Sequence, residues 1–148
     1  MFKKIVFATD GSRDADQALG LAATLAKDGG GEMIVVHCEE FTLPGKGGGR
    51  YPTAVNEDEL KAKIERQVAE LSRDGVRATM KTARANVGGA AHVIAEAARN
   101  ERADAIVVGT RGHTPLAGLL VGSVTQRLLH IAPCPVIAVP TQTRINGN

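Results

Sequence analysis

Residues 105–126 read AIVVGTRGHTPLAGLLVGSVTQ, and this stretch indicates the class of fold more strongly than any other part of the chain. Its start, AIVV, is a short apolar run rich in β-branched residues, which is typical of a buried strand. A loop with four glycines follows, and Ser123 then opens a run with helical spacing of apolar residues. The order of strand, glycine-bearing loop and helix is typical of α/β proteins with parallel sheets.

The same alternation of strand and helix continues on both sides of this stretch. Strands are expected over residues 3–9, 33–38, 77–85, 105–108 and 135–139. Helices are expected to begin after Ser12, after Asn56, after Gly89 and at Ser123, with residues 39–55 as a loop. All the strand runs except 77–85 are apolar on both faces, as in a sheet covered by helices on both sides. The chain therefore predicts an α/β fold with a single doubly wound five-stranded parallel sheet.

The last predicted strand has the features of a sheet edge. It is flanked by Pro133, Pro135 and Pro140, and proline cannot donate a hydrogen bond to a sheet ladder. Its sequence, PVIAV at 135–139, is wholly apolar, so an exposed edge of this kind would invite uncontrolled pairing. We therefore expect two copies of the chain to pair antiparallel through this strand as a homodimer, the alternative being that the tail at 141–148 folds back over the edge in a monomer.

The composition excludes several classes of protein. Of the 148 residues, 43% are hydrophobic and 23% are charged, and no linker divides residues 1–148, so one domain with a polar tail at 141–148 is expected. The net charge is only +2 and aromatic residues make up 3%, so no nucleic-acid partner is expected. No apolar run approaches the about 20 residues that span a bilayer, and the first residues do not resemble a secretory signal, so no membrane is expected. Cys38 and Cys134 lie far apart, which indicates reduced thiols in a cytoplasmic protein.

The glycine-bearing loop has the character of an anion-binding site. Glycine lets the backbone turn sharply and approach a ligand without a Cβ atom between them. The first N–H groups of the helix that begins at Ser123 have no intrahelical partner, and together with the helix dipole they favour a phosphate. Ser123 and Thr125 add hydroxyl groups, and Arg111 and His113 add positive charge. The alternative is a connecting loop that needs glycine for its turn, with Ser123 as an ordinary N-cap.

The loop has the spacing G-x2-G-x9-G-S, which ends at Ser123, and here the sequence resembles the universal stress protein family, specifically its ATP-binding branch. That branch is marked by G-x2-G-x9-G-[S/T]. The segments KKIVFATDGS at 3–12, VVHC at 35–38, IVVGTRGH at 106–113 and GSVTQRLLHIAPCPVIAVP at 122–140 match it as well. The resemblance covers about residues 2–140 and implies a fold like that of the adenine-nucleotide α-hydrolases.

The resemblance also implies which residues bind the nucleotide. Thr9 and Asp10 are implied beside the adenosine moiety, and the adenine pocket is implied to include Ala8, Cys38 and Val108. The residues implied to hold ribose and phosphates are Gly109, Gly112, Gly122, Ser123, Val124 and Thr125, with Arg111 and His113 on the same loop. Ala8 stands where the family often has proline or valine. His113 stands where a basic residue is common, and its charge varies with pH.

Acidic residues after the first strand have a structural interpretation as well. A carboxylate at a strand end, such as that of Asp10, often forms an Asx-turn or caps a helix. Asp14 and Asp16 are expected on the surface, in the first turn of the next helix, where the helix dipole favours negative charge. The segment GKGGGR at 45–50 does not fit GxxxxGK[ST] and is expected to be a mobile loop, the alternative being that it folds over bound nucleotide.

The function that the resemblance implies is that of an ATP-binding regulator of the stress response, with its downstream partner left open. The expected ligands are ATP, or ADP or AMP as purified, with Mg²⁺ or Mn²⁺ on the phosphates. The alternative is an enzyme on the same fold that hydrolyses ATP slowly or phosphorylates itself at Ser123 or Thr125. The SGGxDS motif of adenylating pyrophosphatases, an early HIGH motif and the residue set of a phospho-receiver domain do not occur.

Overall fold

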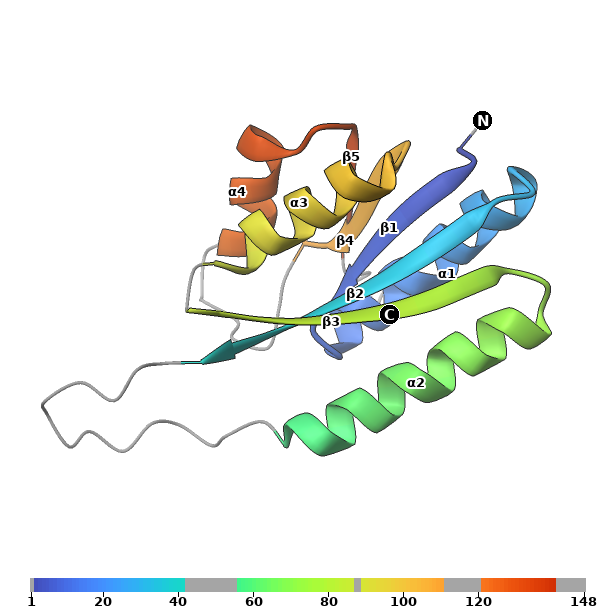
Figure 1. The fold of residues 1–148 in the computed structure, drawn as a ribbon, viewed down its shortest axis with the longest axis horizontal. Helices are drawn as coiled ribbons and strands as arrows, with labels where there is room; N and C mark the ends of the chain where they lie inside the picture. The colour runs from blue at the N-terminus through green and yellow to red at the C-terminus, as the bar shows by residue number, and fades with distance from the viewer. Residues whose placement is uncertain (1, 42–55, 87–88, 111–120, 141–148) are drawn as a thin grey trace, which may run out of the picture.

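The predicted alternation of strands and helices is confirmed by the structure. The computed structural model describes residues 2–41, 56–86, 89–110 and 121–140. Along the chain these residues form β1 (Lys4–Thr9), α1 (Arg13–Asp28), β2 (Glu32–Phe41), α2 (Glu57–Arg73), β3 (Arg77–Asn86), α3 (Ala90–Glu101), β4 (Ala105–Gly109), α4 (Ser123–Ile131) and β5 (Val136–Val139) (Figure 1). Each helix connects two strands, so every crossover is of the strand–helix–strand kind that parallel pairing requires.

The strands of the described residues form one parallel five-stranded sheet in the order β3-β2-β1-β4-β5. From β1 the chain first builds outward through β2 to β3, and then returns to the other side of β1 to build β4 and β5. The direction of winding therefore reverses between β1 and β4, and this position is the switch point of a doubly wound sheet. The predicted fold class is confirmed, and β5 lies at the edge where its prolines place it.

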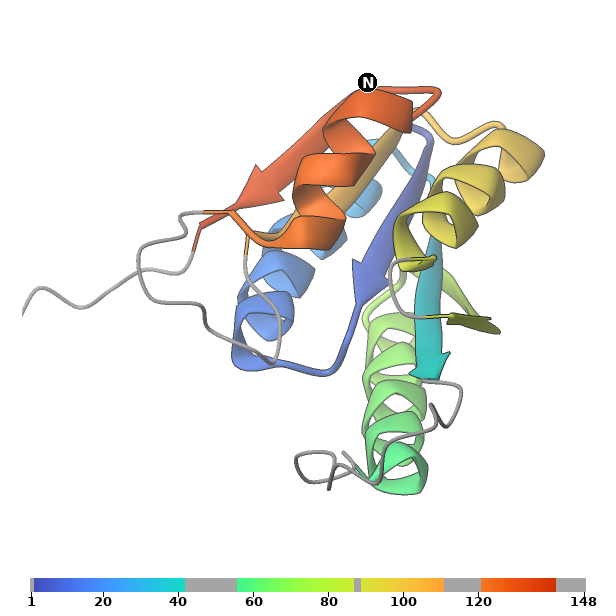
Figure 2. The ribbon, with the colours of Figure 1, turned by 90° about the vertical axis from the view of Figure 1, so that its left-hand side faces the viewer.

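Helices cover both faces of this sheet, and each face has its own hydrophobic core. On one face, alternate residues of β1, β2 and β4 pack against α1 and α2, with Phe7 and Ile64 among the fully buried side chains. On the other face, the intervening residues pack against α3 and α4, with Ile106 and Leu128 at the centre. Figure 2 shows the two layers, with α4 in front of the sheet and α1 behind it. Burial on both faces explains why the central strands read as continuous apolar runs.

The second strand is longer than the sequence predicts. Residues 39–55 were expected to form a loop, but β2 continues to Phe41 because it pairs with β3 along its whole length, from Glu32 opposite Arg77 to Phe41 opposite Asn86. The prediction was wrong for residues 39–41, since this pairing depends on the partner strand and not on the apolar pattern of β2 itself. β3 has the alternating and mostly exposed pattern expected of it, in keeping with its place at the other edge of the sheet.

Candidate functional site

The carboxyl ends of β1 and β4 meet at the switch point of the sheet. β1 pairs with β4 in the register Ile5 opposite Ala105 and Phe7 opposite Val107, so the strands end together at Thr9 and Gly109. The β1–α1 turn (residues 9–12) and the first turn of α4 therefore lie at the same end of the sheet. In open α/β sheets a ligand binds at this position, because the two connections leave the sheet in opposite directions and open a crevice.

The β1–α1 turn is stabilised by its own side chains. Gly11 donates its backbone N–H to Thr9 Oγ1 at 3.0 Å, and Ser12 donates its N–H to Asp10 Oδ1 at 2.9 Å. The second contact is the Asx-turn that the sequence suggested as one role of Asp10. Ser12 in turn accepts the N–H of Ala15 and is the N-cap of α1, as expected. One oxygen of the Asp10 carboxylate thus fixes the turn at the switch point.

The N-cap of α4 is a glycine, Gly122, with φ −69° and ψ 162°, and it supplies no side-chain cap. The N-cap of α3, Gly89, supplies none either, whereas α1 and α2 are capped by the side chains of Ser12 and Asn56. The backbone N–H groups at the start of α4 therefore lack the acceptor that a serine or asparagine cap would supply. Gly122 itself donates its N–H to the carbonyl of Thr110, which keeps this helix start beside the end of β4.

Two of the predicted binding residues also have structural contacts. Thr125 is buried, and its hydroxyl donates to the carbonyl of Gly109 at 2.9 Å, which joins α4 to β4. A Cβ atom at Gly109 would lie 3.0 Å from the backbone carbonyl carbon of Asp14 and 3.2 Å from the backbone nitrogen of Ala15. Glycine at this position therefore makes room for the first turn of α1, whether or not a ligand also approaches it.

Asp14 and Asp16 do not have the simple surface role that the sequence suggested. Asp14 Oδ2 is buried and has no hydrogen-bond partner among the described residues, and Asp16 accepts hydrogen bonds from Lys63 at 2.7 Å and Gln67 at 2.9 Å. For Asp16 the reason is that two side chains of α2 reach across to α1 and contact a residue that an isolated helix would leave to solvent. Both lysine and glutamine come from positions about 50 residues further along the chain, so the helix pattern of α1 alone could not reveal them.

The residues expected around adenine share one face of the sheet. Ala8 and Val108 belong to the core beneath α3 and α4, and Val124 of α4 packs against the same core. Cys38 alternates with the buried His37 and lies on this same face, at the partly exposed carboxyl end of β2. Arg111, Gly112, His113 and the glycine-rich segment at 45–50 lie outside the described residues. Among the described predicted residues, the structure thus brings together the end of β1, the end of β4 and the start of α4.

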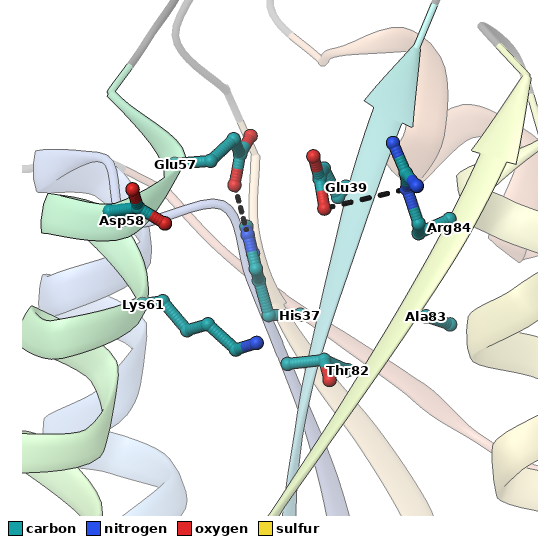
Figure 3. A pocket seen from close by; sticks show the side chains of 8 residues that line it. All are labelled: His37, Glu39, Glu57, Asp58, Lys61, Thr82, Ala83 and Arg84. Atoms are coloured by element: carbon teal, nitrogen blue, oxygen red, sulfur yellow. Dashed lines mark hydrogen bonds and ion pairs between the residues drawn. The ribbon is translucent and has the colours of Figure 1, made fainter.

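A hollow of about 400 Å³ lies at the same end of the sheet, but between β2, β3 and α2. Figure 3 shows its lining residues, which are His37, Glu39, Glu57, Asp58, Lys61, Thr82, Ala83 and Arg84. The ring of His37 is buried and its Nε2 lies 2.9 Å from Glu57 Oε2, while Arg84 Nε lies 3.7 Å from Glu39 Oε2. Within the described residues no three His, Cys, Asp or Glu side chains gather as metal ligands would. Sequence reasoning assigned no role to His37, and a polar residue inside the apolar run of β2 was the signal that could have identified it.

These features define a doubly wound α/β protein with a candidate ligand site at its switch point. The chain belongs to the universal stress protein family, because the profile of that family, described as the Universal stress protein family, matches residues 1–140. A relative from Thermus aquaticus, named universal stress protein in QAH/OAS sulfhydrylase 3'region, is 37% identical over 143 residues, which cover 94% of this chain and 99% of the relative.

Solved structures have the same fold. The protein MJ0577 matches with a TM-score of 0.78 at 24% identity and covers 97% of this chain and 99% of its own length. A universal stress protein from Archaeoglobus fulgidus, solved in complex with dAMP, matches with a TM-score of 0.62 at 26% identity and covers 94% of this chain and 98% of its own. As for membranes, none of the helices in the described residues is both long and apolar enough to cross one.

Proposed function

We propose that this protein binds ATP at the switch point of its sheet and acts in the cytoplasm as a nucleotide-dependent regulator of the stress response. The observation that carries the proposal is the start of α4, where a glycine N-cap supplies no side-chain acceptor to the first backbone N–H groups. These N–H groups lie at the positive end of the helix dipole, which is a common environment for a bound phosphate. The ends of β1 and β4 lie beside this helix start and supply the remainder of the site.

Each predicted residue has a role in this proposal. Adenine binds against Ala8, Cys38 and Val108, and Thr9 and Asp10 contact the adenosine moiety. Ribose and phosphates bind at the backbone and hydroxyl groups of Gly109, Gly112, Gly122, Ser123, Val124 and Thr125, with charge from Arg111 and His113. Mg²⁺ or Mn²⁺ binds to the phosphates rather than to a protein ligand set. The dAMP complex of the Archaeoglobus fulgidus relative supports an adenine nucleotide as the ligand class.

Nucleotide binding in this proposal serves regulation rather than rapid turnover. Fast phosphoryl transfer needs a group that positions the nucleophile and charges that stabilise the transition state. The motif supplies Arg111 and His113 but no carboxylate or glutamine beside the terminal phosphate. Slow hydrolysis or autophosphorylation at Ser123 or Thr125 is the second candidate. A turnover of about 1 per second or more, abolished by a substitution in the site, would favour this enzyme over the regulator.

The proposal is tested by isothermal titration of ATP, with Mg²⁺ present, into the wild-type chain and the Gly122→Val variant. The backbone angles of Gly122 are accessible to any residue, so the variant is expected to fold, but its side chain lies where the phosphate oxygens approach. We expect ATP binding by the wild type and loss of at least about tenfold in affinity in the variant, as for removal of charge-assisted contacts. Gly20→Ala, in the exposed middle of α1, is the control and retains full affinity. Absence of binding by the wild type, or equal binding by Gly122→Val, would refute the site.

A further inference from the structure

His37 connects the β1–α1 turn to α2 through a buried bridge. Its Nδ1 lies 3.0 Å from the carbonyl oxygen of Thr9, which can only accept, so Nδ1 carries a hydrogen and donates it. Its Nε2 lies 2.9 Å from the carboxylate of Glu57, the first residue of α2. The side chain is only 4% exposed, and Figure 3 shows the ring reaching from β2 toward the first turn of α2. The bridge thus joins the carbonyl at the end of β1 to the start of a helix that is distant in sequence.

Lys63 of α2 holds the other end of the same turn. Its Nζ donates to the carbonyl oxygen of Gly11 at 2.9 Å and to Asp16 Oδ2 at 2.7 Å. Leu60, one turn earlier in α2, packs so closely that a Cβ atom at Gly11 would lie 2.4 Å from its Cδ2. Gly11 also has a φ of +75°, a conformation that residues with a side chain rarely adopt. The shape of the turn is therefore matched to the face of α2 that packs on it.

The two carbonyl groups that receive these bonds flank Asp10. Peptide units are planar, so holding the oxygen of Thr9 fixes the plane that leads into Asp10, and holding the oxygen of Gly11 fixes a plane that follows it. A ligand that moves the backbone on either side of Asp10 would therefore strain the bonds from His37 and Lys63. Conversely, a change in the position of α2 would shift the two peptide planes that bracket Asp10.

We infer that His37 and Lys63 are positioning residues that hold Asp10 in its orientation toward the nucleotide and couple nucleotide binding to the docking of α2. The inference rests on the proposed function. It identifies α2 as the element that changes when a nucleotide binds at the site. Coupling of this kind is reciprocal: if docked α2 raises the affinity for ATP, bound ATP stabilises the docking of α2 by the same factor. The start of α2 carries Asp58 and Lys61 and faces Glu39 of β2 and Arg84 of β3. A shift of α2 would therefore change the charged surface that a partner protein contacts.

The first test compares Lys63→Met with Gln67→Met by isothermal titration of ATP. Gln67 donates to the same Asp16 carboxylate but, among the described residues, makes no hydrogen bond to the turn, so it is the matched control for the contact with Gly11. We expect the dissociation constant of ATP to rise about fivefold to tenfold in Lys63→Met, the lower part of the range of allosteric coupling factors, and to remain unchanged in Gln67→Met.

The second test separates the two bonds of His37. An asparagine amide nitrogen lies as many bonds from Cα as Nδ1 of histidine, and a glutamine amide nitrogen as many as Nε2. His37→Asn therefore retains a donor toward Thr9 but loses the contact with Glu57, and His37→Gln does the reverse. Each variant loses one bond, and thermal unfolding reports the loss of stability. A positioning role predicts weaker ATP binding in His37→Gln than in His37→Asn, while a merely structural role predicts that affinity follows stability.

Hydrogen exchange supplies a measurement that distinguishes the two proposals. Without nucleotide, the amides of residues 9–14 are expected to exchange faster in Lys63→Met than in Gln67→Met. With saturating ATP, exchange in the N-terminal half of α2 is expected to slow in the wild type and to remain unchanged in Lys63→Met. Equal affinities of the two methionine variants and an α2 that does not respond to bound ATP would overturn the coupling and leave ATP binding intact. A wild-type chain that binds no ATP would instead overturn the proposed function, and with it the role assigned to Asp10.

Discussion

Cys38 and Cys134 are both partly exposed, but they lie in different chemical surroundings. Cys38 is at the carboxyl end of β2, in the proposed adenine pocket, whereas Cys134 precedes β5 beneath α4. Burial, and to a lesser extent the charge of Asp104, raises the pKa of the Cys134 thiol. Because the thiolate is the reactive form, Cys134 is expected to react slowly with an alkylating reagent at neutral pH and faster as the pH rises through its raised pKa.

Labelling of Cys38 and Cys134 with and without ATP tests where adenine binds. Iodoacetamide labelling followed by peptide mass spectrometry reports both cysteines of one sample. We expect ATP to slow the labelling of Cys38 and to leave the labelling of Cys134 unchanged, because only Cys38 lies in the proposed pocket. Protection of both cysteines would indicate a general stabilisation of the fold, and protection of neither would contradict the placement of adenine against Cys38.

At the scale of elements, a group of charges joins the C-terminal end of α3 to the sheet. Glu101 accepts a hydrogen bond from Lys81 of β3 and lies 3.6 Å from Lys4 of β1, which in turn lies 3.7 Å from Glu32 of β2. The hydrogen bond and charge of Lys81, aided by Lys4, lower the pKa of Glu101. The carboxylate is partly exposed to solvent, so its contribution to stability is sensitive to salt.

The lowered pKa determines how stability varies with pH. A carboxyl group whose pKa is lower in the folded than in the unfolded chain stabilises the fold above its ordinary pKa, and this contribution is lost as the pH falls through the lowered value. Glu101→Gln is therefore expected to be less stable than wild type at about pH 7 and equally stable at about pH 2, by urea unfolding. In about 1 M NaCl, where the Debye length is about 3 Å, the difference at neutral pH should shrink. Gln126→Glu, on the exposed face of α4, is a control that alters charge away from this group. A difference that persists in strong acid would show that the side chain acts through packing.

For the whole molecule, the two edges of the sheet differ in character. β3 carries the exposed side chains of Arg77, Lys81 and Arg84, and charged side chains of this kind on an edge strand discourage pairing with another chain. β5 is wholly apolar and partly exposed at every residue, and Leu129 of the adjacent α4 is 58% exposed. Figure 2 shows β5 at the outer side of the sheet. We therefore propose that two copies pair through β5 and not through β3.

Light scattering tests this assembly, and the choice of variant matters. Ile137 and Val139 pack against the core beneath α1, so charged substitutions there would disturb the fold as well as an interface. Since Ile106 donates to the carbonyl of Pro135 and Thr110 to that of Val139, the backbone groups of Ala138 face away from β4. Ala138→Pro removes an outward donor and is expected to reduce the mass from two chains to one. Thr79→Lys, on the exposed side of β3, is expected to retain the mass of two chains. A wild-type mass of one chain at micromolar concentration would contradict the proposal.

The alternation of strands and helices, the parallel doubly wound class and the edge position of β5 could all be predicted from the amino-acid sequence. These features follow from local properties: apolar runs of strand length, helical spacing, the caps at Ser12 and Asn56, and prolines around β5. It also indicated the end of the sheet at which the candidate site lies, because the glycine-bearing loop follows β4 directly. Each of these signals depends on residues within about one or two turns of each other, so the chain shows them without its partners.

The end of β2, the need for a small residue at Gly109 and the contacts of His37 became known only from the packed molecule. β2 reaches Phe41 because β3 pairs with it, Gly109 lies against the backbone of α1, and His37 bridges Thr9 and Glu57. In each case the partner comes from a different element of the fold. For His37 the two partners lie 28 and 20 residues away along the chain. No periodic pattern encodes such a pairing, because it depends on which helix packs on which strand and in what register. The link between α2 and the switch point is therefore a property of the packed molecule and not of any one segment of its sequence.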